Sequence, residues 1–406
     1  MSENTINSEI VLLTHEYPPY VFGGVATYME NIAEWFSKRG WKVLVIAGRA
    51  DPQNRLVVKR KGNLTIVRTY FPEIPPRWFI YSLVVRNYLK KMLTNITTSK
   101  VILTNGLSAW LILRKLNINS SHFLITVFHG SMYAPISMFK SILNYRNMGK
   151  IPPEEFLYFM EAPLHDFLVK KDLDISDYYI FVAQHVSKEF ERLYQEKGTK
   201  IRERGKIVYP GIEFEYLTKL SQNVKTREKN RNIIAFVGRL FYSKGVFYAV
   251  KSIDYLVNEL REKDFELWVF GKGPLEPWLE NYIKRRNLSR FVKKLGFLPR
   301  DKLLFNLAKH VNVLLHPSLY EAAPLTIMES QSLGIPVVTF DLPWSQEFVL
   351  EGINGYKAQY PDLTQLSKYL IKATEIEQKK VIRTAKRYDR EISFSTLENI
   401  IIETLA

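Results

Sequence analysis

The chain contains no cysteine among its 406 residues. It therefore has no disulfide bond, no thiolate nucleophile and no cysteine ligand for zinc. It also lacks a hydrophobic run long enough to span a bilayer, because its most apolar stretches, such as 101–116, are short and interrupted by polar residues. The first ten residues are polar and do not resemble a secretory signal, so we expect a cytoplasmic protein.

Acidic residues are in short supply, with 41 Asp and Glu against 57 Lys and Arg, and the formal net charge is +16. Such a charge favours phosphates, lipid headgroups or nucleic acid as partners. Nucleic-acid binding is disfavoured, because the densest basic run is only 59–61 and no RNA-binding aromatic motif or zinc pattern is present. The length predicts two to three domains.

Short aliphatic and β-branched runs alternate with helical patterns along most of the chain. We expect strands at 9–14, 41–48, 63–70, 100–105, 122–130, 178–184 and 206–211, and again at 232–238, 265–271, 311–318 and 336–341. This alternation is typical of βαβ units and parallel sheets. Between the two groups, 213–231 is charged and has no apolar period, which indicates a linker or hinge. The sequence thus predicts an α/β fold with two Rossmann-like lobes, 1–212 and 232–390.

Two acids separated by seven residues, Glu321 and Glu329, lie in the segment LLHPSLYEAAPLTIMESQSLGIPVV at 314–338. Pro324 stands where a helix is expected to begin. The backbone N–H groups of Leu325 and Thr326 would then point out of the helix start, where an anionic phosphate is favoured. Glu329 would lie on the same helix face as Leu325.

A second segment carries two cations, Arg239 and Lys244, between an expected strand end and an expected helix start. An anionic phosphate ligand in such a place needs its charge neutralised by a metal or by fixed cations and dipoles. These two cations and the helix start can serve that purpose without a metal. The alternative is that both are ordinary solvated charges on a surface loop.

Taken in order, these segments resemble the retaining family 4 glycosyltransferases of the GT-B fold. The matching pieces are Glu321-x7-Glu329 with its flanks at 317–318 and 334–338, FVGRLFYSKG (236–245), GKGP (271–274), PPYVFGGVATY (18–28), TVFHG (126–130) and YPGIE (209–213). The tail around Phe394-Ser395 resembles a C-terminal helix that crosses back to the first lobe, so 391–406 is expected to join it. The likeness covers most of the chain.

The resemblance implies two lobes facing a central cleft and transfer of a hexose, with retention, from a UDP- or GDP-sugar to a saccharide or lipid-linked acceptor. No metal or other cofactor is implied. Glu329 is expected to hold the donor ribose, and Glu321 to lie near the reacting carbon. His129 and the pair Gly23 and Gly24 are expected to contribute from the first lobe.

Plainer interpretations of these residues stay open. The acids can be ordinary helix-start carboxylates, His129 a packed core residue, and the glycines a simple turn. His316 is expected to be structural. A disaccharide phosphorylase on the same fold, with phosphate in place of the nucleotide, is the alternative function.

The sequence departs from the family pattern at two places. Ala322-Ala323 stands where the family usually has a glycine beside the first acid, and 342–346 replaces a glycine pair before Glu347. The second loop commonly touches the donor sugar, so the sugar's identity stays open. Asp172 and Asp174 form an acid-x-acid pair that could suggest a metal, but isolated acidic pairs are usually solvated.

The first lobe is the basic one, with 16 Lys and Arg against 7 Asp and Glu in residues 1–130. Within it, 77–93 places Trp78, Tyr81, Val85, Leu89 and Met92 at helical spacing beside Arg86, Lys90 and Lys91. Together with the Met- and aromatic-rich stretch 131–175, this predicts peripheral contact with an anionic membrane at its cytoplasmic face. The alternative is a helix whose apolar face covers the sheet.

Overall fold

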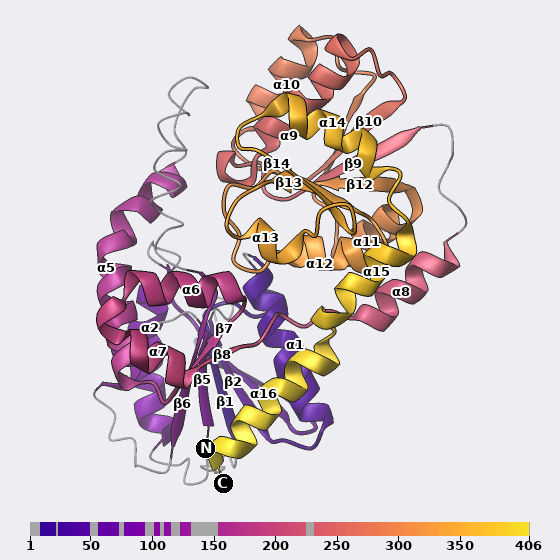
Figure 1. Cartoon of the computed structure of the whole chain (residues 1–406). Helices are drawn as coiled ribbons and strands as arrows, with labels where there is room; N and C mark the ends of the chain where they lie inside the picture. The colour runs from indigo at the N-terminus through magenta and orange to yellow at the C-terminus, as the bar shows by residue number, and fades with distance from the viewer. Residues whose placement is uncertain are drawn as a thin grey trace. The chain divides into compact units, whose positions relative to one another are not determined.

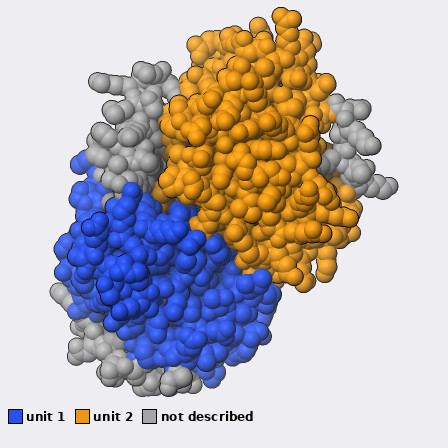
Figure 2. All heavy atoms as spheres, in the orientation of Figure 1, with its two compact units in different colours: residues 1–133, 157–211, 391–406 blue, residues 134–156, 212–390 orange. Residues whose placement is uncertain are grey.

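The computed structural model describes residues 9–21, 23–48, 56–72, 77–93, 101–105, 109–114, 122–130, 153–224 and 231–405. The stretch 131–152 of the predicted apolar insert and residues 225–230 of the predicted linker lie outside these ranges. The chain forms two compact units, coloured blue and orange in Figure 2. Unit 1 comprises Met1–Tyr133, Leu157–Gly211 and Glu391–Ala406, and unit 2 comprises Ala134–Phe156 and Ile212–Arg390.

Unit 1 is built on an eight-stranded sheet with the order β3-β4-β2-β1-β5-β6-β7-β8. All neighbours are parallel except β3 and β4. Its strands are β1 (Ile10–Thr14), β2 (Val43–Gly48), β3 (Leu56–Lys61), β4 (Leu64–Thr69), β5 (Val101–Asn105), β6 (Phe123–Phe128), β7 (Tyr178–Phe181) and β8 (Gly205–Ile207). The sequence did not predict β3, because this charged edge strand lacks the apolar run of the others. It also extended the last strand too far, since β8 ends at Ile207.

The helices of unit 1 cover both faces of its sheet. They are α1 (Gly24–Lys38), α2 (Arg77–Leu93), α3 (Ala109–Leu113), α5 (Pro153–Ile175), α6 (Gln184–Leu193), α7 (Gly198–Arg204) and α16 (Arg390–Leu405). Helix α16 runs beside α1 (Figure 1), where the indole N–H of Trp35 donates to Glu391 and that of Trp41 donates to Glu398. The C-terminal helix therefore packs on unit 1, as the motif at Phe394-Ser395 predicts.

The prediction that the apolar row of 77–93 faces a membrane was wrong. Tyr81, Val85 and Leu89 on α2 are at most 1% exposed and pack in the core beneath the helix. The row is apolar because it covers the sheet, which is the alternative interpretation. The side chains of Lys90 and Lys91 lie outside the described residues. Among the helices of the described chain, none is both long and apolar enough to cross a membrane.

Unit 2 is built on a parallel sheet of six strands with the order β11-β10-β9-β12-β13-β14. Its strands are β9 (Asn232–Val237), β10 (Phe265–Phe270), β11 (Val292–Gly296), β12 (Val311–Leu315), β13 (Val337–Phe340) and β14 (Gly355–Ala358). The sequence predicted the four inner strands, which are rich in apolar residues. It missed the edge strands β11 and β14, because each is short and carries lysine.

In unit 2, helices α9, α10 and α14 lie on one side of the sheet, and α11, α12, α13 and α15 lie on the other (Figure 1). Their bounds are α8 (Phe214–Asn223), α9 (Val246–Asp254), α10 (Glu276–Arg285), α11 (Arg300–His310), α12 (Leu325–Ser332), α13 (Ser345–Phe348), α14 (Leu363–Ala373) and α15 (Gln378–Ala385). Helix α8 corrects the interpretation of 213–231 as a linker. Its buried anchor, Leu217, was too isolated to produce an apolar period.

Candidate active site

Three loops of unit 2 meet at the carboxyl ends of the neighbouring strands β10, β9 and β12. The N–H of Leu240, after β9, donates to the carbonyl of Lys272, after β10, at 2.9 Å. The N–H of Leu319, after β12, donates to the carbonyl of Ser243 at 2.8 Å. Ligands of open α/β sheets bind at this edge, so the loops define the candidate site of this unit.

Gly245 lets two of these loops approach closely. Its φ of +77° favours glycine, and a Cβ at this position would lie 2.1 Å from the carbonyl oxygen of Pro317. A side chain would therefore push the loop after β9 away from the loop after β12. The close approach brings Lys244 to the side chain of Glu321.

Glu321 is held by two nitrogen groups. Its Oε1 lies 2.7 Å from Nζ of Lys244 and 3.0 Å from Nε2 of His316, and its side chain is only 12% exposed. Burial alone would raise the pKa of Glu321, but the Lys244 ammonium and the hydrogen bond from His316 hold it well below its usual range. Glu321 is thus a buried carboxylate that stays ionised at neutral pH.

His316, which is expected from the sequence to be structural, supports the side chain of Glu321. Besides its bond to Glu321, its ring stands edge-on to Trp344, with 5.8 Å between ring centroids. Trp344 is 2% exposed and belongs to the loop that departs from the family pattern. This loop therefore supports the ring that orients Glu321.

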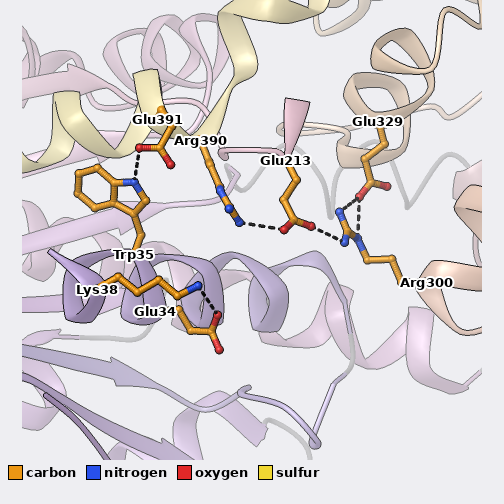
Figure 3. A network of polar contacts seen from close by, with 8 residues as sticks. All are labelled: Glu34, Trp35, Lys38, Glu213, Arg300, Glu329, Arg390 and Glu391. Atoms are coloured by element: carbon orange, nitrogen blue, oxygen red, sulfur yellow. Dashed lines mark hydrogen bonds and ion pairs between the residues drawn. The ribbon is translucent and has the colours of Figure 1, made fainter. Parts of the chain in front are cut away.

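Glu329 lies on α12 in a separate polar network (Figure 3). Nη2 and Nε of Arg300 lie 2.8 and 2.9 Å from its Oε1. Arg300 also pairs with Glu213 at 3.0 Å, and Glu213 pairs with Arg390 at 2.9 Å. Burial raises the pKa of Glu329, and Arg300 offsets this only in part.

Helix α12 begins as the sequence predicts, at Leu325 directly after Pro324. Its first intrahelical bonds are donated by Ile327 and Met328 to the carbonyl of Pro324. The N–H groups of Leu325 and Thr326 precede these bonds, at the positive end of the helix. Arg239 is exposed on the loop after β9, where its guanidinium lies 4.8 Å from the ring centre of Phe241.

The remaining predicted site residues belong to unit 1. The N–H of Gly23, which precedes α1 at Gly24, donates to Glu16 at 3.0 Å. His129 follows β6, and its ring stands edge-on to Tyr28 of α1 at 5.1 Å. Burial lowers the pKa of His129 to about 4, so this imidazole is neutral at pH 7. Among the described residues, Nε2 of His129 and the Tyr28 hydroxyl are buried without a hydrogen-bond partner.

The acid-x-acid pair of α5 makes bonds within unit 1. Asp172 accepts the N–H of Trp110 at the start of α3, at 2.8 Å, and Asp174 pairs with Lys197. In the part of the chain that the structure describes, no three His, Asp or Glu side chains gather as they would around a metal ion.

The structure brings Lys244 and Glu321 together and places Glu329 on the helix that starts at Leu325. Sequence reasoning missed Arg300, Glu213 and Glu16 as partners of the predicted residues. Arg300 stands 29 residues before Glu329 and follows an edge strand that was itself not predicted. No local pattern links them, so only the folded chain shows the contact.

Two Rossmann-like units, each with polar residues at the carboxyl ends of its strands, are the architecture of the GT-B fold. Residues 22–216 match the model described as Glycosyltransferase Family 4, and residues 218–389 match that described as Glycosyl transferases group 1. The chain belongs to family 4 of the glycosyltransferases.

Relatives and solved structures agree with this assignment. An uncharacterized glycosyltransferase of Methanocaldococcus jannaschii is 23% identical over 86% of this chain and 84% of its own length. The UDP-Gal:alpha-D-GlcNAc-diphosphoundecaprenol alpha-1,3-galactosyltransferase of Escherichia coli is 26% identical over 38% of this chain and 40% of its own.

Two solved structures illustrate the shared fold. Sucrose-phosphate synthase from Thermosynechococcus elongatus has a TM-score of 0.73 at 16% identity, covering 97% of this chain and 98% of that one. The Anabaena protein HepE in complex with UDP has a TM-score of 0.64 at 18% identity, covering 98% and 99%.

Proposed function

We propose that this glycosyltransferase moves a hexose from a UDP- or GDP-sugar to its acceptor with retention of configuration and without a metal ion. The observation that carries the proposal is the contrast between two buried acids, Glu321 beside Lys244 and Glu329 beside Arg300. A relative named as a UDP-Gal transferase and a similar fold solved with UDP support a nucleotide sugar as the donor.

Each group has a role in the proposed reaction. Glu329 accepts hydrogen bonds from the ribose hydroxyls, while Arg239, Lys244 and the N–H groups of Leu325 and Thr326 hold the diphosphate. Glu321 lies near C1 of the hexose and stabilises the positive charge that develops there. Charge neutralisation by these cations and dipoles is the basis for proposing that no metal is needed.

The chemistry proposed is front-side substitution. The bond between C1 and the diphosphate oxygen breaks while the acceptor oxygen bonds to C1 on the same face. The departing phosphate oxygen takes the proton of the acceptor hydroxyl, so atoms and charge balance. His129 contributes from unit 1 as a neutral imidazole that hydrogen-bonds the sugar. Gly23 and Gly24, at the beginning of α1, contribute backbone without side chains.

The experiment combines a donor panel with product analysis. UDP-glucose, UDP-galactose, UDP-N-acetylglucosamine and GDP-mannose are incubated with saccharide acceptors and with a polyprenyl-diphosphate-linked sugar, with and without EDTA. We expect an α-linked product from an α-linked donor and no loss of rate with EDTA. The α linkage is seen by NMR as a small H1–H2 coupling for glucose, galactose and N-acetylglucosamine products, and from the one-bond C1–H1 coupling for a mannose product. A β-linked product would overturn retention, and a rate restored only by Mg²⁺ or Mn²⁺ would overturn metal independence.

The phosphorylase alternative makes a different prediction for ligand binding. A phosphorylase needs no ribose contact, so nucleotides should not stabilise it, whereas a transferase should melt at a higher temperature with UDP or GDP present. Thermal shifts with UDP, GDP and inorganic phosphate separate the two. Stabilisation by phosphate alone would favour phosphorolysis.

A membrane-borne acceptor is supported by an exposed row on α5, in place of the buried row on α2. Met160, Leu164, Phe167 and Ile175 are 61%, 38%, 48% and 36% exposed and share one face of the helix. Two cations border this row. Nζ of Lys171 lies 5.6 Å from the ring centre of Phe167. The guanidinium of Arg114 lies 4.4 Å from the ring centre of Trp110, and the Trp110 and Phe167 ring centres are 6.0 Å apart.

The two cations at the edge of the row favour an anionic surface. Asp166 and Asp172 of the same helix make bonds within unit 1, to Tyr194 and to the N–H of Trp110. An apolar helix face with cations at its edge fits a bilayer that contains anionic lipid. We therefore include peripheral binding at such a bilayer in the proposed function.

Vesicle flotation tests the proposed surface. We expect binding to vesicles of phosphatidylcholine with phosphatidylglycerol at low salt, and at least a tenfold loss for the double variant Met160→Gln, Phe167→Gln. Phe297→Gln is the matched control, because Phe297 is a 72% exposed aromatic residue of unit 2. Equal binding by the double variant and the control variant would remove α5 as the contact and leave a soluble saccharide as the better acceptor.

A further inference from the structure

Arg300 lies between two carboxylates of unit 2 that come from distant parts of the chain (Figure 3). It is the first residue of α11, Glu329 belongs to α12, and Glu213 directly precedes α8. Its side chain is 34% exposed, against 14% for Glu329 and 30% for Glu213. Arg300 thus joins Glu329, on the helix proposed to bind the donor, to Glu213, which directly precedes α8.

The geometry of the pair is one-sided. Nε and Nη2 of Arg300 both converge on Oε1 of Glu329, at 2.9 and 2.8 Å. Two donors on one oxygen fix the rotation of the carboxylate. Oε2, the other oxygen of the same group, is turned away from the guanidinium and can accept from a ligand hydroxyl.

We propose that Arg300 is a positioning residue for the donor: it fixes Oε1 of Glu329 so that Oε2 is aimed at the ribose hydroxyls. This inference rests on the proposed function of Glu329 as the ribose-binding acid. Arg300 itself touches neither the nucleotide nor the sugar. We expect replacement of Arg300 to weaken donor affinity and to have little effect on turnover at saturating donor.

The electrostatic setting agrees with this role. Burial raises the pKa of Glu329, Arg300 opposes that rise, and the nearby charge of Glu213 adds to it. Arg300 and Glu213 are the described charged groups that act on this carboxyl, and Glu213 is in turn compensated by Arg390. A protonated Glu329 is a poorer acceptor for ribose, so Arg300 also keeps the acid in its binding form.

The test is donor binding by calorimetry between pH 5 and 8, with UDP-glucose and GDP-mannose measured side by side. For Arg300→Gln we expect about tenfold weaker binding at pH 7 from the lost charged hydrogen bonds, with turnover at saturating donor within threefold of the unaltered enzyme. Arg300→Lys should recover part of the affinity, since it keeps the charge but loses the two-pronged contact.

The pH profiles give a readout that a general disturbance would not produce. Arg300→Gln removes the cation, so the pKa of Glu329 rises and binding is lost at a higher pH as the solution is acidified. Glu213→Gln removes the neighbouring anion, so the pKa falls and binding persists to a lower pH. Opposite shifts support positioning by charge and contact, whereas shifts in the same direction would overturn it.

Arg286→Gln is the matched control. Arg286 forms a comparable pair with Asp254 in the same unit, at 2.7 Å, away from α12. It should lose stability without losing donor affinity. If Arg286→Gln weakens binding as much as Arg300→Gln, the effect of Arg300 is only structural.

Failure of the inference and failure of the proposed function are distinguishable. If Glu329→Gln binds donor normally, or neither donor binds the unaltered enzyme, the proposed function is wrong. If Glu329→Gln loses affinity while Arg300→Gln keeps it at every pH, only the positioning role is wrong. In the double variant Arg300→Gln, Glu329→Gln we expect no loss of donor affinity beyond that of Glu329→Gln alone.

Discussion

Glu321 and Glu329 are eight positions apart, and both have side chains less than 15% exposed, yet the pKa of Glu321 is lowered and that of Glu329 is raised. Burial acts to raise both pKa values. Lys244 and His316 converge on Glu321 and reverse the effect, whereas Glu329 has one arginine that a second acid also uses. The pKa of a buried acid thus depends on how many positive or hydrogen-bonding groups contact it. Two acids close in sequence can therefore have pKa values shifted in opposite directions.

The largest expected effect is on turnover. Glu321→Gln keeps the shape of the side chain but removes the charge proposed to stabilise the reacting carbon, so kcat should fall about 100-fold or more. Glu329→Gln should act mainly on the donor KM. Steady-state kinetics at several donor concentrations separate the two, and equal kcat losses in both variants would end the distinction between the acids.

The next effect concerns the close approach that brings Lys244 to Glu321. Gly245→Ala combines a positive φ with a clash against Pro317, and we expect about a tenfold loss of activity with roughly 2–3 kcal/mol of lost stability. Gly352→Ala is the control, because Gly352 has a φ of +69° but open space where a Cβ would lie. It should cost about 1 kcal/mol from strain alone and leave kinetics unchanged. Normal kinetics for Gly245→Ala would show that the close approach of the loops after β9 and β12 is not needed for activity.

A smaller effect is expected on stability. The pKa of Glu321 is lowered by folding, so its stabilisation is present at neutral pH and is lost as the pH falls. Glu321→Gln also leaves Lys244 without its anion and should lower the Tm of unit 2 by roughly 3–6 °C at pH 7.

For Glu329 the sign is reversed. Folding raises its pKa, so the carboxyl stabilises the unit below the ordinary pKa of glutamic acid and loses this as the pH rises. Glu329→Gln should therefore leave the Tm at pH 7 nearly unchanged or raise it. Melting curves of both variants check the pair, and a larger Tm loss for Glu329→Gln would contradict the assignment.

The smallest effect extends the comparison to two partly buried histidines of unit 1, His129 and His165. Burial lowers the pKa values of His129 and His165 to about 4, so acidification from pH 7 to 5 protonates them in the unfolded chain first and destabilises the fold. Replacing either by Asn should make the fall of stability with acid shallower, by up to about 1.4 kcal/mol per pH unit. Only His129→Asn should also reduce turnover, and loss of activity in His165→Asn would remove this distinction.

Much of the fold could be predicted from sequence, because buried parallel strands are continuous apolar runs. The strands that escaped, β3, β11 and β14, lie at sheet edges where charge is tolerated. Helix α8 escaped because one buried residue does not make a period. The apolar row of α2 was misassigned because a helix that covers a sheet and one that lies on a membrane have the same pattern.

The candidate site divides in the same way. The positions of Lys244 before a helix, of Pro324 at a helix start and of Glu329 on that helix could be predicted, because each follows from a local sequence pattern. The partners that set their charge, His316 for Glu321 and Arg300 for Glu329, could not be assigned. These contacts arise where loops and helices from different parts of the sequence meet.

The return of α16 to unit 1 affects how the protein is made. The larger segment of unit 2 is in effect inserted into unit 1, because the chain leaves unit 1 after Gly211 and rejoins it at Glu391. Trp35 lies on α1, and Trp41 follows that helix. During synthesis their hydrogen bonds to Glu391 and Glu398 cannot form until these residues, more than 350 positions later, have been made. The larger segment of unit 2, Ile212–Arg390, is continuous and can fold while the first unit still lacks its last helix, so the N-terminal unit is the last to be completed.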